Sequence, residues 1–124
     1  MLTLFIRAYL LLIYFDLHLA KANFAAFYGK VRNRPLGDTP VSEDAIQKIC
    51  SAVDLACIWY WKEVLCLQRS AATAFLLKQH GVSAQLFIGA KKIPFRAHAW
   101  VEVDGRVVND KPYMREMYAV LDRC

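Results

Sequence analysis

The sequence predicts one α+β domain in which helices come first and a small antiparallel sheet follows. Three observations predict it. Apolar residues recur at helical spacing in two N-terminal segments. A segment rich in Ala and Leu, without Pro or Gly, runs from Cys66 to His80. Alternating apolar and polar residues, separated by turn residues, fill most of the last third. With 124 residues, the chain is long enough for one hydrophobic core, so residues 1–124 are expected to form a single domain.

The N-terminal segment is mainly apolar over residues 1–15, and apolar residues return at 24–28. We therefore expect one long hydrophobic helix over residues 1–28. Its uninterrupted apolar run is shorter than a membrane span requires, so we do not expect it to cross a membrane. A secretory signal peptide is the alternative, with Ala20-Lys21-Ala22 as its cleavage motif. The return of apolar residues after that motif favours a helix that packs in the core or against a partner.

Residues 29–40 hold Gly, Pro and charged residues, which predicts a loop. Ser42 then caps a second helix whose first turn carries two acidic residues. Cys50 and Cys57 fall on the apolar stripe of that helix and are expected to be small core residues.

Composition excludes several classes of function. The chain has four cysteines and no pair at metal-ligand spacing, so we expect reduced thiols, no metal, no cofactor and a cytoplasmic protein. The net charge of +5 comes mainly from residues 66–124. No Lys/Arg run with interleaved aromatic residues appears there, so we expect no nucleic-acid partner.

The segment that begins at Cys66 predicts a reactive thiol. A cysteine in the first helical turn lies at the positive end of the helix dipole, where backbone N–H groups favour the thiolate. A thiolate nucleophile needs a base, and the base needs an orienting group. His98 and Asp110, which follow on the predicted strands, supply those two side-chain types.

The strands are predicted from alternation. Residues 83–89 form the first, residues 89–94 a turn, and residues 95–103 the second, with His98 on its more polar face. Asp104-Gly105 turns the chain, residues 106–110 return, and residues 113–122 form a short helix or turn.

The length of this last turn decides which way Asp110 points. A two-residue loop pairs Val103 with Arg106 and sends Asp110 to the face opposite His98. A three-residue loop pairs Glu102 with Arg106 and sets His98 directly opposite Asp110. We predict the three-residue loop.

Three sequence runs together resemble a known family: Cys66-Leu67-Gln68-Arg69-Ser70, residues 94–102 (PFRAHAWVE) and residues 105–110 (GRVVND). They are similar to the transglutaminase-like cysteine enzymes, and more closely to the lasso-peptide leader peptidases. The resemblance implies a transglutaminase-like (papain-like) core over residues 41–124. In that core, the helix that starts at the nucleophile packs on a small antiparallel sheet, with further helices before it.

The resemblance also implies a function. A Cys66–His98–Asp110 triad would remove the leader from a lasso-peptide precursor, freeing the amine that a lasso cyclase joins into a macrolactam. A separate leader-recognition protein would deliver the leader, and the hydrophobic helix, or the loop around Arg32 and Arg34, is a candidate interface. Trp61, Arg69 and Trp100 are expected to contact the substrate, although Arg69 has the alternative role of capping neighbouring structure. Another acyl-transfer enzyme or a non-catalytic peptide-holding scaffold remains an alternative.

Overall fold

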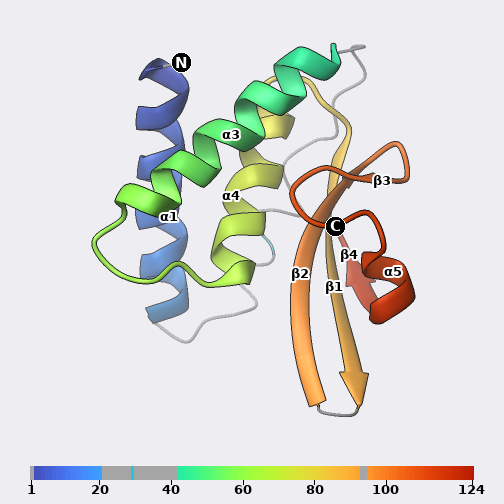
Figure 1. Cartoon of the computed structure of the whole chain (residues 1–124). Helices are drawn as coiled ribbons and strands as arrows, with labels where there is room; N and C mark the ends of the chain where they lie inside the picture. Colours follow the sequence, from blue (N-terminus) through green and yellow to red (C-terminus); the bar gives the residue numbers. More distant parts are fainter. Residues whose placement is uncertain (1, 21–28, 30–41, 93–94) are drawn as a thin grey trace.

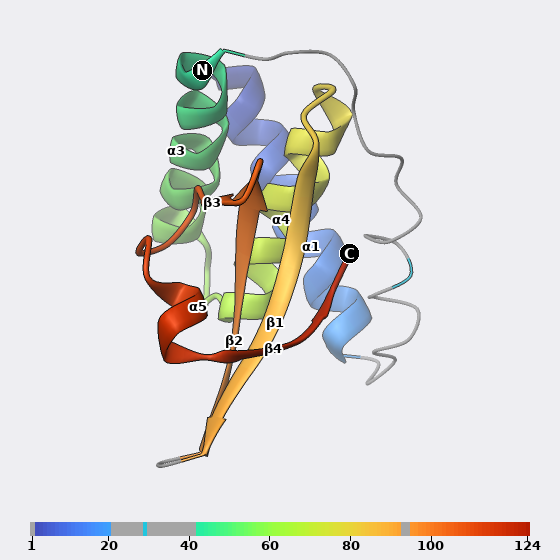
Figure 2. The same ribbon diagram turned by 90° about the vertical axis from the view of Figure 1, so that its right-hand side faces the viewer.

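The computed structural model describes residues 2–20, 29, 42–92 and 95–124. Three long helices lie on one face of a four-stranded sheet: α1 (Leu2–Ala20), α3 (Glu43–Trp59) and α4 (Cys66–Gln79) (Figure 1). A short helix, α5 (Met114–Met117), lies on the opposite face (Figure 2). The predicted α+β architecture is confirmed.

Helix α1 buries one stripe and exposes another. Ala8, Leu12 and Phe15 are fully buried against the other helices. The helix is described as far as Ala20, so the predicted continuation over residues 21–28 lies outside the described residues. The same holds for nearly all of the predicted loop over 29–40. None of the described helices has the length and apolarity that crossing a membrane requires.

Helix α3 begins as the sequence predicts. The Ala45 N–H donates to Ser42 Oγ at 3.2 Å, which satisfies a first-turn donor. Cys50 is buried and Cys57 half-buried in the main core. Burial raises the pKa of each thiol to about 11, so both stay protonated near neutral pH. They are core residues rather than reactive ones.

Helix α4 is the central element, because it packs against α1, α3, β1 (Ala84–Lys92) and β2 (Phe95–Val103). Its buried alanines bring the helix backbone close to its neighbours. Buried polar side chains fasten it at two points. Gln68 Nε2 donates to the Leu12 carbonyl at 2.7 Å, and Ser70 Oγ donates to the Ala99 carbonyl at 3.0 Å. Gly81, at φ 81°, ends the helix as expected.

The sheet has the order β3-β2-β1-β4, with β3 at Arg106–Val107 and β4 at Ala119–Arg123. Neighbouring strands run antiparallel, and β1 and β2 pair along their whole length. Three predictions need correction. The first strand continues to Lys92 instead of turning after Gly89, the returning strand stops at Val107, and part of the predicted C-terminal helix or turn is strand β4.

The predicted three-residue loop is wrong. Val103 pairs with Arg106 and Glu102 with Val107, so the loop is Asp104-Gly105. Both loop residues have positive φ, at 52° and 76°, as a two-residue hairpin of the primed type requires. The chain then leaves the ladder. The Val108 N–H still donates to the Val101 carbonyl at 3.0 Å, but the Val101 N–H donates to Asn109 Oδ1 instead of to a backbone carbonyl. This departure frees the next residue from the strand's alternation of faces.

Candidate active site

Cys66 opens α4 at the end of a loop that leaves the helix start uncapped by any side chain. Leu65, the N-cap residue, has extended backbone angles and makes no side-chain cap bond. The first-turn N–H groups of α4 therefore provide a positive end beside the thiol. Cys66 is half-exposed and lines a pocket of about 180 Å³ with Leu67, Ile88, Ala97, His98 and Ala99. The predicted nucleophile and base thus border the same small, mainly apolar hollow.

His98 and Asp110 are joined by a short hydrogen bond. His98 Nε2 lies 2.6 Å from Asp110 Oδ2. A carboxylate can only accept a hydrogen bond, so Nε2 carries the proton and Nδ1 is left for another partner. Among the described residues no hydrogen bond joins Cys66 to His98, so their proximity rests on the shared pocket. Their exposed fractions, 25% for His98 and 18% for Asp110, leave the pair shielded yet within reach of a substrate.

The electrostatics of Asp110 favour its anionic form. Burial by itself raises the pKa of Asp110, but hydrogen bonds from His98 and from the Lys111 N–H outweigh it and lower the pKa below its ordinary value. The positive charge of Arg69 acts in the same direction. Asp110 is therefore a carboxylate at neutral pH and can stabilise an imidazolium on His98.

Asn109 sets the position of Asp110, and sequence reasoning missed it. Its buried side chain accepts from the Val101 N–H at 2.8 Å and donates to Ser70 Oγ at 3.0 Å. Asn109 thereby joins β2 to α4 at the point where the chain leaves the sheet. The only sequence signal was Asn109-Asp110 itself, which reads as ordinary turn chemistry.

Arg69 contacts neighbouring structure, which the sequence offered as the alternative to contact with the substrate. Its guanidinium contacts Asp54 Oδ1 at 2.9 Å and donates to the Asn109 carbonyl at 2.7 Å. It therefore links α3, α4 and the segment that carries Asp110. These contacts hold the candidate site together and leave less of the guanidinium for a substrate.

Trp100 and Trp61 are placed very differently. Trp100 is fully buried on the sheet face opposite α4, where its ring packs with Phe87 and Tyr118. Its ring stacks against that of His98, with 6.3 Å between the ring centroids, and it does not reach a surface groove. Trp61 is 72% exposed in the loop that leads to Cys66, where its ring lies 4.9 Å from Lys62 Nζ.

Glu102 anchors the C-terminal segment to the sheet. This carboxylate is buried, accepts from the Trp100 indole N–H at 2.9 Å, and receives two hydrogen bonds from Arg115, at 2.8 and 2.7 Å. Burial alone raises the pKa of Glu102, yet the bonds from Arg115 and Trp100 lower it overall. The pair fixes α5 over the outer face of β2.

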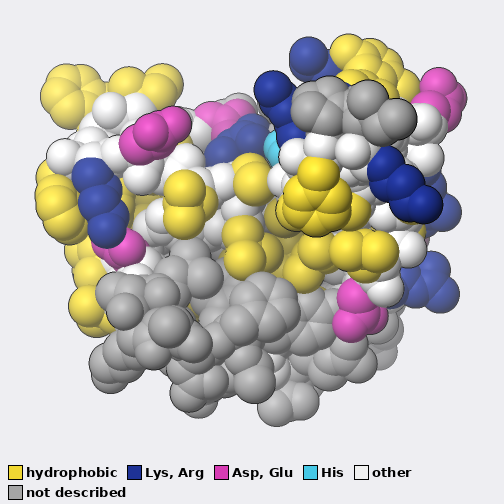
Figure 3. Space-filling view, turned by 90° about the horizontal axis from the view of Figure 1, so that it is seen from below, with side chains coloured by type: hydrophobic (Ala, Val, Ile, Leu, Met, Phe, Trp, Pro, Cys, Tyr) yellow, Lys and Arg dark blue, Asp and Glu magenta, His cyan; other side chains and the backbone are white. Residues whose placement is uncertain are grey.

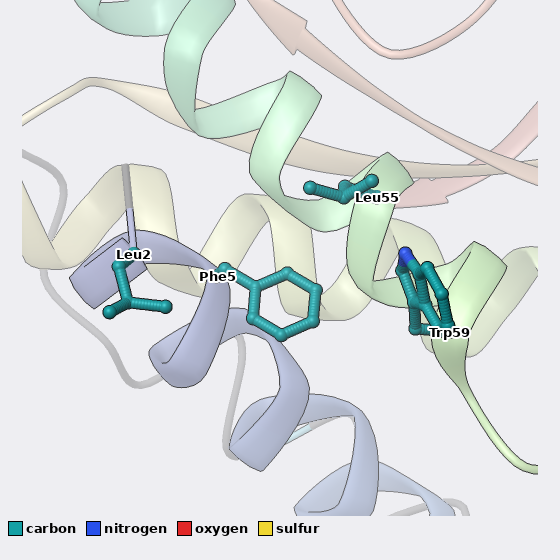
Figure 4. Close-up of a pocket in the computed structure, with 4 residues that line it drawn as sticks. All are labelled: Leu2, Phe5, Leu55 and Trp59. Carbon is teal, nitrogen blue, oxygen red and sulfur yellow. The ribbon is translucent and has the colours of Figure 1, made fainter.

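An apolar surface runs along the helical side of the molecule. We call it the outer helix surface; its exposed members are Leu2, Ile6, Leu10, Leu17, Leu55, Ile58 and Trp59. Between α1 and α3 it hollows into a pocket of about 340 Å³, lined by Leu2, Phe5, Leu55 and Trp59 (Figure 4). Seen from below, hydrophobic side chains are visible on both the helical side and the sheet side of the molecule, and most visible Lys and Arg side chains lie on the sheet side (Figure 3).

Within the described residues, no group of three or more His, Cys, Asp or Glu side chains is arranged to hold a metal ion. Cys66 and His98 line the pocket, and the Asp110 carboxylate contacts His98, so the site offers a thiol, an imidazole and a carboxylate. This set can perform nucleophilic acyl transfer, in which the thiol attacks and the imidazole moves the proton.

Comparison with known proteins finds one family and one related protein that match the chain. The model of the Transglutaminase-like superfamily matches residues 9–123. The Microcin J25-processing protein McjB of Escherichia coli is 43% identical over 56 residues, which is 45% of this chain and 27% of that protein. The match therefore spans about a quarter of the relative's length. No solved structure matches the chain.

Proposed function

This chain belongs to the transglutaminase-like superfamily, and on that premise we propose that it is a cysteine peptidase that removes the leader from a lasso-peptide precursor. The observation that carries the proposal is the short His98–Asp110 pair at the pocket that Cys66 lines. The similarity to a microcin-processing protein supports a precursor peptide as the substrate.

The proposed reaction begins with transfer of the Cys66 thiol proton to His98 Nδ1, while Nε2 donates to Asp110. Cys66 Sγ then attacks the carbonyl carbon of the last leader residue, and a carbon–sulfur bond forms as negative charge moves to the oxygen. The Cys66 backbone N–H is one donor to that oxyanion, since first-turn N–H groups have no intrahelical acceptor.

The tetrahedral intermediate then collapses. The carbon–nitrogen bond breaks, His98 gives its proton to the departing amine, and the core peptide leaves with a free N-terminus. Water attacks the remaining thioester with His98 as base, which releases the leader as a carboxylate and restores the thiol. The freed amine is the group that a partner lasso cyclase would join to a side-chain carboxylate.

A processing assay tests the proposal. The wild-type chain, Cys66→Ala and His98→Ala are incubated with the cognate precursor and its leader-recognition protein, and the products are weighed by mass spectrometry. We expect a shortened core peptide from the wild-type chain only. Processing by Cys66→Ala would favour the scaffold alternative, whereas a mass that shows a new amide in place of a cut would favour another acyl-transfer activity.

We also propose that the outer helix surface receives the separate leader-recognition protein. Its exposed apolar side chains, together with the pocket between α1 and α3, suit an apolar partner surface. Leu10→Ser should weaken partner binding measured by calorimetry, because Leu10 is 59% exposed and contributes little to folding. Phe95→Ser, an exposed apolar residue on the sheet side, is the matched control. Unchanged binding by a folded Leu10→Ser, Trp59→Ser double variant would refute this docking site.

A further inference from the structure

Tyr118 covers the candidate catalytic imidazole. Its ring stacks on His98 with 5.3 Å between centroids and 22° between planes. The centroid of the same ring lies 6.1 Å from that of Trp100. His98 and Trp100 are themselves stacked, at 6.3 Å and 23°. The three rings form one cluster on the outer face of the sheet. Tyr118 is only 9% exposed, so its ring is held in place rather than free to swing.

The backbone around Tyr118 is built to bring it this close. Gly89 pairs with His98 across β1 and β2, and β1 has an irregularity between Ile88 and Gly89 where β4 joins it. A Cβ at Gly89 would meet Trp100 ring atoms at 2.8 Å and Tyr118 Cβ at 2.9 Å. The absence of a side chain at Gly89 therefore makes room for the Tyr118 ring beside the imidazole.

Two further contacts hold the segment that carries Tyr118. The Arg115–Glu102 pair fastens α5 one turn earlier, and the Tyr118 N–H donates to the Met114 carbonyl at 3.0 Å. Strand β4 continues directly into pairing with β1. Lys91 Nζ lies 5.6 Å from the centre of the Tyr118 ring. Contacts with residues of β1 and β2 thus restrain the ring, and α5 holds the backbone that carries it.

We propose that Tyr118 is a positioning residue for His98. The stack fixes the plane of the imidazole so that Nε2 meets Asp110 while Nδ1 stays available to the thiol of Cys66. This inference rests on the proposed peptidase function. The C-terminal segment that carries Tyr118 would then help to orient a site whose three reacting side chains come from earlier parts of the chain.

Three variants test it in the processing assay. Tyr118→Phe keeps the ring and should keep kcat within roughly threefold of the wild type. Tyr118→Leu removes the ring and should lower kcat by roughly tenfold or more with little change in KM, because misorientation affects the reaction more than binding. Phe87→Leu is the matched control, since Phe87 stacks on Trp100 in the same cluster at 5.9 Å. It should lower stability but leave kcat within roughly threefold.

A second readout separates failure of this inference from failure of the proposed function. The alkylation rate of Cys66 by iodoacetamide, resolved from the other cysteines by mass spectrometry, needs no substrate. Tyr118→Leu and His98→Ala should both slow it at pH 6, and Tyr118→Phe should not. Should Tyr118→Leu not fold, Tyr118→Met takes its place, because Met fills irregular space. The inference would be overturned if Tyr118→Leu, or its replacement Tyr118→Met, kept the wild-type kcat and alkylation rate. It would also be overturned if Phe87→Leu lowered kcat as much as Tyr118→Leu does.

Discussion

His98 Nε2 and Asp110 Oδ2 lie 2.6 Å apart, and Asn109 holds the backbone bend that allows this contact. The imidazole comes from a regular strand, whereas the carboxylate comes from a segment that has just left the sheet. Their approach therefore depends on side-chain hydrogen bonds as much as on strand pairing.

Replacing the carboxylate tests the orientation of the imidazole. In Asp110→Asn the side chain keeps its shape but can donate as well as accept, so it no longer enforces a proton on Nε2 or stabilises an imidazolium. We expect precursor cleavage to fall by roughly 10²- to 10⁴-fold while the fold is kept. Circular dichroism supplies the control for folding. A fully active Asp110→Asn would show that the contact has no catalytic role.

Asn109→Ala tests the bend itself. The variant leaves the Val101 N–H and Ser70 Oγ without their buried partner, which should cost about 1–3 kcal/mol in the free energy of unfolding. Cleavage should fall beyond what the remaining folded fraction explains, because Asp110 loses its support. Urea denaturation and the processing assay measure the two effects. Gln47→Ala, on the exposed face of α3, is the control and should change neither.

Acid should destabilise the fold through Glu102 and Asp110. The pKa of each is lowered in the folded state, so each stabilises the fold above its unfolded pKa, about 4 for these side chains. That stabilisation is lost as the pH falls through the folded pKa. The free energy of unfolding should therefore drop as the pH falls below about 4 and through the lower folded pKa of each group.

Glu102→Gln separates the contribution of Glu102 from that of Asp110. At pH 7 it should cost about 1–3 kcal/mol, because Arg115 and the Trp100 indole lose an anionic acceptor. At acid pH, the free energy of unfolding measured by urea denaturation should fall less steeply with decreasing pH in Glu102→Gln than in the wild type. Glu116→Gln, an exposed carboxylate on α5, provides the comparison and should retain the wild-type slope. If the free energy of unfolding of Glu102→Gln fell as steeply with pH as that of the wild type, Glu102 would not contribute to the acid sensitivity.

Gly89→Ala tests the close packing beneath His98. The added methyl group meets Trp100 and Tyr118 at less than 3 Å, so we expect a loss of about 1–3 kcal/mol in stability. Differential scanning calorimetry measures it as a lower Tm. Gly105→Asn, where nothing lies within 4 Å and Asn tolerates positive φ, should cost less than about 1 kcal/mol. A Tm at Gly89→Ala equal to that of the wild type would mean that the cluster repacks freely.

The sequence predicted the elements whose signals are local. The Ser42 cap, the helix that starts at Cys66, the Gly81 stop and the strand that carries His98 all follow from capping, composition or alternation, and the structure confirms them. Strand β4 was not predicted, because its residues are exposed and show no alternation of burial. It forms because the edge of β1 offers it backbone partners.

The candidate site shows why register reasoning alone was insufficient. The Asp-Gly pair does form the two-residue loop that should have separated His98 from Asp110. The Asn109 side chain replaces one ladder hydrogen bond and ends the alternation one residue before Asp110. Such a replacement depends on Ser70 of α4 and Val101 of β2 meeting in space, which no local pattern reveals.

The measurement that tests the central claim most directly is the mass of the enzyme during turnover. The wild-type chain is mixed with precursor and its recognition protein, quenched in acid within seconds, and digested for mass spectrometry. Our account predicts a transient leader adduct, joined as a thioester, on the peptide that contains Cys66, and no adduct in Cys66→Ala. Leader removal by Cys66→Ala, or an adduct on any other residue, would contradict it.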